Sequence, residues 1–88
     1  MSPFDKNVAL LVRWTGEANW HFIESVNHGT TECNVRVPFK EAALEFGEIE
    51  IREIKSFKGT CKKCFHEICI EVQDPRLWEI YYAYVVNA

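Results

Sequence analysis

Two cysteines separated by two residues, Cys61 and Cys64, restrict the folding of this chain more than any other feature. A tight turn lets both thiolates reach one tetrahedral Zn²⁺ ion, and the lysines between them, Lys62 and Lys63, favour the deprotonated sulfurs. One such pair supplies only half of a tetrahedral site. The pattern therefore predicts a zinc knuckle whose other ligands come from elsewhere in the chain.

The remaining ligands have two possible sources among the other histidines and cysteines. In the first set, which we favour, His28 and Cys33 flank a turn and complete the site from across a sheet. In the second set, His66 and Cys69 complete it locally, which requires a predicted strand to fold back on itself. Free cysteines are also common as small buried apolar residues, an interpretation that fits Cys69 best. His21 is a further donor that neither set uses.

The length of 88 residues predicts one small domain, residues 1–88, because a chain of this size buries only about 60% of its unfolded surface. An apolar fraction of 48% excludes a disordered or low-complexity chain. A formal net charge of −3 argues against a partner held mainly through phosphate charge. A core this small gains stability from a bound metal.

No stretch of the sequence has the pattern of an export signal or a membrane span. The apolar run over 8–12 is too short for a signal peptide, and the run over 80–86 lies between Glu79 and Asn87. We expect a soluble cytoplasmic protein with no membrane contact. In that reducing compartment free or metal-bound thiols are favoured over disulfides.

Alternating apolar residues predict five or six antiparallel strands. Five of them cover residues 8–14, 20–26, 33–37, 48–57 and 68–72. The first two are expected to pair as a hairpin. The fourth needs a bulge near Arg52, because Ile54 falls out of phase with the preceding alternation.

One short helix is predicted from Pro38 to Gly47, where apolar residues recur at three- and four-residue spacing. The last segment, 75–86, fits two structures. Asp74 and Pro75 are suited to begin a helix, whereas alternating aromatic and β-branched residues favour a sixth strand, which we prefer. The predicted fold class is α+β, mostly antiparallel β, with the zinc knuckle between the fourth and fifth strands.

Residues 48–64, an alternating strand followed by IKSFKGTCKKC, resemble the strand-and-knuckle segment of the 3CxxC zinc-binding family, which includes the receptor-transporting proteins. The apolar residues of 35–39 are similar to the strand that precedes it in the family. No cysteine stands at 23–27, where the family has its first CxxC, so the resemblance implies a ligand role for Cys61 and Cys64 alone. Family members act as binding modules or trafficking chaperones, which implies a protein partner.

Acidic and aromatic residues predict a surface that binds another protein. Glu48 and Glu50 form an acidic stripe on the outer face of the fourth strand, although such a stripe is often only the solvated side of a sheet. Trp78 and Tyr82 belong to an aromatic segment too rich to be wholly buried, and exposed aromatic residues anchor interfaces. We expect an adaptor or inhibitor-like module that is a monomer or a homodimer.

A zinc knuckle that binds single-stranded nucleic acid is the alternative. Its lysines would contact phosphates and its phenylalanines would stack on bases. The residues concerned are Phe57, Lys58, Lys62, Lys63 and Phe65. The acidic net charge of the chain favours instead an ordinary solvated surface.

Catalytic patterns are missing from the sequence: it has no phosphate-binding glycine loop, HExxH or GxSxG. We therefore expect no enzymatic activity. A thioredoxin-type redox use of the CxxC pair requires a helix directly after it, whereas we predict a strand there.

Overall fold

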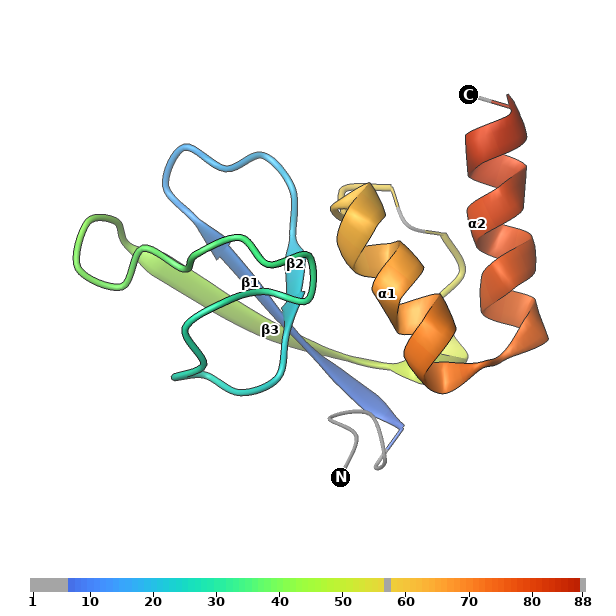
Figure 1. Cartoon of the computed structure of the whole chain (residues 1–88), viewed down its shortest axis with the longest axis horizontal. Helices are drawn as coiled ribbons and strands as arrows, with labels where there is room; N and C mark the ends of the chain where they lie inside the picture. The colour runs from blue at the N-terminus through green and yellow to red at the C-terminus, as the bar shows by residue number, and fades with distance from the viewer. Residues whose placement is uncertain (1–6, 57, 88) are drawn as a thin grey trace.

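In a computed structural model the chain forms a three-stranded antiparallel sheet followed by two helices (Figure 1). The structure describes residues 7–56 and 58–87. The strands are β1 (Val8–Trp14), β2 (His21–Ile23) and β3 (Leu44–Glu50), in the order β2-β1-β3. A 3-10 turn, η1 (Ile51–Glu53), and the helices α1 (Lys62–Val72) and α2 (Pro75–Asn87) complete the fold. Neither helix has the length and apolar character needed to cross a membrane.

β1 is the central strand because apolar residues occupy both of its faces. Successive side chains of a strand point to opposite faces, so Ala9 and Val12, both fully buried, lie on opposite sides of the sheet. Ala9 belongs to the main core, which the sheet shares with α1 and α2. Val12 packs with Ile23 and Val37, a residue of the long loop between β2 and β3. In Figure 1 that loop covers the sheet, and α1 lies between the sheet and α2.

The predicted count of five or six strands with one short helix is wrong. The described residues form three strands and two helices. The first two predicted strands do pair as an antiparallel hairpin, in which Leu11 lies opposite Phe22. Their pairing needs only the short turn between them, so the local alternation of apolar residues is sufficient to predict it.

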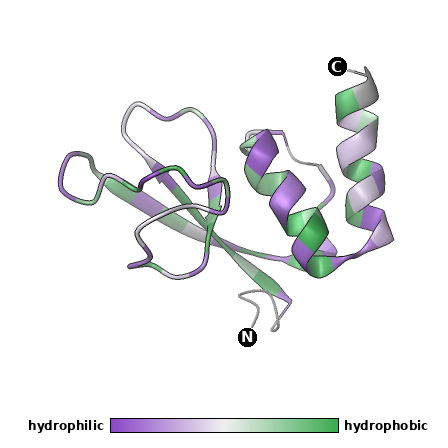
Figure 2. Cartoon of the chain, viewed as in Figure 1, coloured by the Kyte–Doolittle hydropathy of each residue, from purple (hydrophilic) through white to green (hydrophobic). Residues whose placement is uncertain are grey.

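The predicted fifth strand is part of α1. Its alternation would place Ile70 inward, but Ile70 is 46% exposed. The buried residues follow helical spacing instead and form one stripe: Cys64, Phe65, Ile68 and Cys69. Figure 2 shows hydrophilic and hydrophobic residues sharing this helix, as expected for one that covers a core with a single face. Gln73, with a φ of 57°, ends the helix in the left-handed conformation.

The preferred strand over the last segment is also wrong, because 75–87 form α2. The Asp74 carboxylate accepts a hydrogen bond from the backbone N–H of Arg76 at 2.9 Å, which satisfies a free donor of the first turn. Pro75 suits the first helical position, where no intrahelical donor is required. Leu77 is fully buried and docks the helix on the main core.

The segment 33–47 contains neither the predicted third strand nor the predicted helix. A single bridge, Thr30 to Arg36, is its only strand-like pairing outside β3. Pro38 begins just one turn, in which its carbonyl accepts a hydrogen bond from Ala42 N–H at 3.2 Å. The apolar residues that suggested a helix are largely solvated, since Phe39 is 41% exposed. Extending β3 from Leu44 instead pairs it with the whole of β1.

η1 takes the place of the bulge that the sequence predicts near Arg52 to bring Ile54 inward. β3 ends at Glu50, and the chain then makes one 3-10 turn. Residues three apart eclipse one another in such a turn, so Ile51 and Ile54 are buried together in the main core. No bulge is needed.

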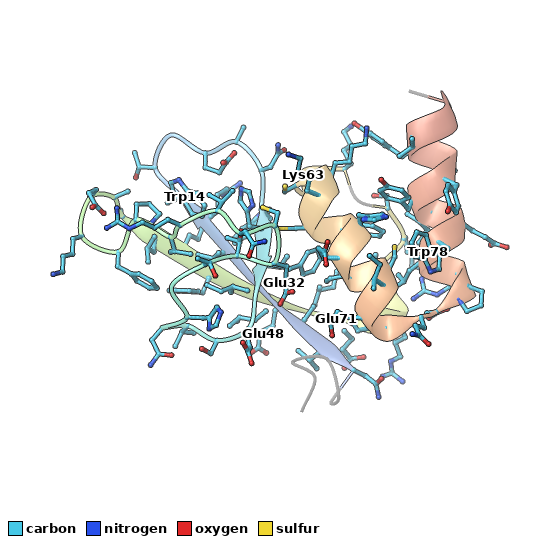
Figure 3. The ribbon with its side chains drawn as sticks, in the orientation of Figure 1. Trp14, Glu32, Glu48, Lys63, Glu71 and Trp78 are labelled. Atoms are coloured by element: carbon cyan, nitrogen blue, oxygen red, sulfur yellow. The ribbon has the colours of Figure 1, made fainter. Side chains whose placement is uncertain are left out.

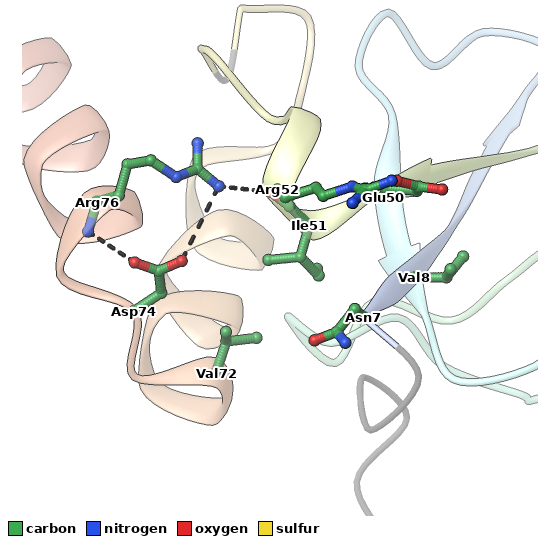
Figure 4. Close-up of a pocket in the computed structure, with 8 residues that line it drawn as sticks. All are labelled: Asn7, Val8, Glu50, Ile51, Arg52, Val72, Asp74 and Arg76. Carbon is green, nitrogen blue, oxygen red and sulfur yellow. Dashed lines mark hydrogen bonds and ion pairs between the residues drawn. The ribbon is translucent and has the colours of Figure 1, made fainter.

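Arg76 ties the start of α2 to η1 (Figure 4). Its guanidinium donates hydrogen bonds to the carbonyls of Ile54 and Ile51, the latter at 2.6 Å, and lies 3.9 Å from the Asp74 carboxylate. Arg76, Asp74 and Ile51 line a cleft of about 490 Å³ between α2 and the end of β3. Arg76 thus supplies a donor to the Ile54 carbonyl and a second donor to the Ile51 carbonyl, which also accepts the Ile54 N–H at 3.2 Å within the 3-10 turn.

Replacing Arg76 by methionine is expected to lower the free energy of unfolding by about 1.5–3 kcal/mol, because charge-assisted hydrogen bonds are lost while the apolar stem is kept. The matched control is Arg52→Met, whose guanidinium bonds the Glu50 carboxylate among the described residues and whose side chain is 81% exposed. That change should stay within about 0.5 kcal/mol. Urea denaturation measures both values, and equal losses would contradict the role assigned to Arg76.

Candidate metal centre

Four side chains from separate parts of the sequence converge on one point, and we call them the ligand cluster: His21, Cys33, Cys61 and Cys64. His21 opens β2, Cys33 lies in the loop after it, Cys61 precedes α1 and Cys64 lies in its first turn. The ligand atoms of all four lie within 4.8 Å of one another. His21 and Cys64 are buried, and the other two are half-buried.

Backbone pairing brings His21 to the CxxC pair. Trp20 donates its N–H to the Gly59 carbonyl at 2.7 Å, and Cys61 donates its N–H to the Trp20 carbonyl at 2.7 Å. Gly59 has a φ of 82°, a left-handed conformation that glycine adopts without a steric penalty. The start of β2 therefore runs alongside the segment that leads into α1.

Cys33 is placed by a tight turn fastened to β2. Glu32 donates its N–H to the Phe22 carbonyl at 2.9 Å, and Asn34 donates to the Thr31 carbonyl at 2.9 Å. The Thr31 hydroxyl lies 3.1 Å from the Cys33 sulfur and also accepts the Val35 N–H. These bonds fix the position of the Cys33 thiol without a metal ion.

The start of α1 orients Cys64. Phe65 donates its N–H to the Cys61 carbonyl at 3.0 Å, so helical geometry begins between the two cysteines. One turn of helix then directs the Cys64 sulfur back toward β2, where it lies 4.0 Å from the Phe22 carbonyl oxygen. A CxxC pair at a helix start thus offers both sulfurs to the same point.

Three separations within the ligand cluster match the edges of a metal tetrahedron. With Zn–S about 2.3 Å and Zn–N about 2.0–2.1 Å, a regular tetrahedron has edges of about 3.8 Å between sulfurs and about 3.6 Å between sulfur and nitrogen. The Cys61 and Cys33 sulfurs are 3.8 Å apart. The Nδ1 atom of His21 is 3.6 Å from the Cys33 sulfur and 3.5 Å from the Cys64 sulfur. The four residues therefore fit a single divalent ion.

The environment perturbs two of these thiols in opposite directions. Burial raises the pKa of Cys33, but hydrogen bonds with Thr31, Cys64 and His21 outweigh it and bring the pKa down to about 7. Burial raises the pKa of Cys64, and the Cys33 side chain raises it further. A divalent cation is the natural means of stabilising a thiolate at the Cys64 position.

The structure joins three of the four predicted metal ligands. Cys33, Cys61 and Cys64 converge, whereas the fourth donor of the ligand cluster is His21 and not His28. The His28 side chain is 44% exposed, and its Nδ1 lies 3.5 Å from the Glu24 carboxylate. The pairing of Trp20 with Gly59 and Cys61 has no sequence signature, which is why the sequence could not single out His21.

The second ligand set predicted from the sequence is not assembled. His66 lies against aromatic rings, 5.6 Å from Trp78 and 5.2 Å from Tyr81 between ring centroids. Cys69 is fully buried in the main core, where burial raises its pKa to about 11. Cys69 therefore has the environment of a small apolar residue.

The CxxC pair lies at the start of the helix α1, and not before a strand as predicted. The predicted strand therefore no longer argues against a redox role for the two cysteines. Two other observations favour metal binding instead. Cys33 and His21 approach both sulfurs at ligand distances, and the Cys64 thiol is fully buried. A redox pair needs an accessible, reactive thiolate, whereas a closed set of four ligands is typical of structural zinc.

The predicted partner-binding residues lie on two separate elements. Glu48 and Glu50 belong to β3, where Glu48 is exposed and Glu50 pairs with Arg52 at 2.7 Å. Trp78 and Tyr82 lie one turn apart on α2 with stacked rings, whose centroids are 5.5 Å apart. Figure 3 shows Glu48 beside the sheet and Trp78 on the second helix.

The predicted nucleic-acid residues are divided by burial. Lys58, Lys62 and Lys63 are exposed, and Figure 3 shows Lys63 near the beginning of α1. Phe65 is 1% exposed and packs against the rings of Phe22 and Tyr81. The remaining residue of this set, Phe57, lies outside the described residues. Phe65 is therefore a core residue and presents no face on which a base could stack.

Fold and site together define a small domain in which a three-stranded sheet and two helices carry one histidine and three cysteines at metal-binding distance. No protein-family model, curated protein or solved structure matches the chain. The resemblance of residues 48–64 to the 3CxxC family accordingly stays a prediction.

Proposed function

We propose that this chain is a small protein-binding module whose fold is held by one structural zinc ion. The observation that supports zinc is the agreement between the ligand separations and the edges of a tetrahedron. Three cysteines and one histidine form a closed ligand set that leaves no position for a substrate, as in structural zinc sites. The proposal accordingly assigns no reaction to the chain.

A zinc ion at this point would join parts of the chain that lie far apart in the sequence. His21 belongs to β2, Cys33 to the loop after it and Cys64 to α1, so one ion would fix the helix to the sheet. Metal binding contributes directly to folding when the unfolded chain has no preformed site. We place the protein in the cytoplasm, where reducing conditions keep its thiols available for the ion.

The protein-binding half of the proposal rests on an aromatic face formed by His66, Trp78, Tyr81 and Tyr82. Their rings contact one another across α1 and α2. Tyr82 is 55% exposed, although its ring stacks on Trp78. Tyrosine and tryptophan are enriched among the residues that contribute most of the binding energy at protein interfaces. We therefore propose the aromatic face as the surface that meets a protein partner.

Photo-cross-linking from this face tests the protein-binding proposal. A benzophenone amino acid at position 82 should give one discrete protein adduct in the cells that make the protein, and Trp78→Ala should abolish it. The same probe at Phe46, an aromatic residue of β3 that is 39% exposed, should give none. Equal adducts from both positions, or none from position 82, would refute the assignment of the interface.

The nucleic-acid alternative has less support. Its lysines are exposed, but Phe65 is buried and the chain carries a net charge of −3. Stacking on aromatic rings is the main sequence-tolerant source of affinity for single strands. We therefore do not propose it as the function.

A further inference from the structure

We infer that Glu17 is a positioning residue of the metal centre, acting through a hydrogen bond that holds the His21 imidazole with its Nδ1 atom toward the three cysteine sulfurs. The inference rests on the zinc site proposed above. It assigns a role to a residue that contributes no ligand atom to the ligand cluster.

The two nitrogens of His21 face different partners. Nδ1 lies 3.5 Å and 3.6 Å from the sulfurs of Cys64 and Cys33. Nε2 lies 3.1 Å from a carboxylate oxygen of Glu17. A neutral imidazole carries one proton, and a carboxylate can only accept it, so the proton belongs on Nε2. Nδ1 is then left with its lone pair directed at the metal position.

A hydrogen bond from a ligating histidine to a carboxylate is a common feature of metal sites. It fixes the ring orientation and increases the basicity of the ligating nitrogen. His21 is 4% exposed, so water has little access to compete for the Nε2 proton. The Glu17 carboxylate is the partner that the structure provides for that proton.

Glu17 is itself held in place, which an incidental surface contact would not require. Its second carboxylate oxygen accepts the N–H of Asn19 at 3.2 Å. Its own N–H donates to the Trp14 carbonyl at 2.9 Å, closing a turn in which Gly16 has a φ of 91°. The Trp14 ring stacks on His21 with centroids 5.0 Å apart and planes 12° apart. The turn after β1 thus fixes both the carboxylate and the plane of the imidazole.

A second histidine of the same chain shows that spacing alone does not create this arrangement. Glu24 and His28 are also four residues apart, and their closest polar atoms are 3.5 Å apart. Their side chains are 49% and 44% exposed, and neither residue belongs to the ligand cluster. Glu24 is therefore a matched control for Glu17.

The experiment compares the zinc affinity of the full chain with that of Glu17→Ala, Glu17→Gln and Glu24→Ala by competition with a chromophoric chelator. Glu17→Ala should weaken zinc binding about 10- to 100-fold, the range found when an outer partner of a ligand is removed. Glu17→Gln should lose less, because its carbonyl still accepts the Nε2 proton. Glu24→Ala should stay within about 2-fold of the parent chain.

Nitrogen-15 NMR of the zinc-loaded chain supplies a readout that a merely structural role would not change. In the parent chain, Nε2 of His21 should carry a slowly exchanging proton, and Nδ1 should show the nitrogen-15 chemical shift of a metal ligand. In Glu17→Ala the Nε2 proton should exchange rapidly. A parent chain that binds no zinc would refute the proposed function itself. If the parent chain binds zinc and Glu17→Ala binds it equally tightly, the role of Glu17 alone is refuted. The same holds if the NMR spectrum shows that Nε2 of His21 is the ligand.

Discussion

The Cys64→Ala chain is expected to lose its zinc ion and most of its stability. Structural zinc contributes about 10–16 kcal/mol of apparent binding free energy to small metal-dependent folds, which is comparable with the roughly 5–15 kcal/mol that holds a typical domain together. Cys64 is fully buried, and its sulfur lies 3.5 Å from His21 Nδ1, so the change removes one of the four ligands from the interior of the site. Metal analysis of the purified chain and thermal melting with and without chelator measure the two effects.

Cys69→Ala is the matched control for this change. Cys69 lies on the same helix and is also fully buried, but it is outside the ligand cluster. Its loss should cost about 1 kcal/mol and leave one zinc ion per chain. Chelator should lower the melting temperature of the parent and of Cys69→Ala sharply and leave that of Cys64→Ala unchanged. Bound zinc in Cys64→Ala, or a parent chain that melts identically with chelator, would refute the metal centre.

The sequence predicts the fold only where neighbouring segments pair. The hairpin of β1 and β2 follows from local alternation, because one short turn brings the two strands together. β3 lies on the other side of β1, beyond a long loop, and its extent follows from pairing along the whole of β1. A helical pattern that begins at Pro38 cannot outweigh that pairing, since its apolar residues would remain solvated.

The two helices were missed because their residues satisfy two periods at once. In 62–72 both a strand and a helix would bury Ile68 and Val72. Only a strand would also bury Ile70, which is 46% exposed in the structure. Aromatic and β-branched types in 78–86 favoured a strand, although Asp74 and Pro75 already carried the signal for a helix start. Tertiary packing decides between the periods, and propensity alone does not.

The candidate site was easier to predict than the fold around it, but only in its cysteines. Thiolates two residues apart are chemically specific, and the sequence adds Cys33 because this residue flanks the turn between the second and third predicted strands. The choice of histidine depends on the backbone pairing of Trp20 with Gly59 and Cys61. A contact between such distant segments leaves no local pattern, so the sequence favours His28, which flanks the same predicted turn as Cys33.

His21→Asn is expected to weaken zinc binding by more than the roughly 100-fold that can follow the loss of an outer-shell partner, because a ligand itself is removed. His28→Asn should change the affinity by no more than about 2-fold, since the His28 side chain is 44% exposed, pairs with Glu24 and lies outside the ligand cluster. Both changes replace a histidine that lies four residues after a glutamate. They share this spacing and differ in burial and in the position relative to the three sulfurs.

Cobalt substitution shows which set of ligands the ion uses. In the parent chain and in His28→Asn, Co²⁺ should give the intense visible bands of a tetrahedral site with three sulfurs and one nitrogen. In His21→Asn those bands should shift and weaken as water or a side-chain oxygen takes the fourth position. The reverse pattern, with His28→Asn affected and His21→Asn unchanged, would restore the ligand set predicted from the sequence. It would also require the segment after β2 to move so that His28 reaches Cys33.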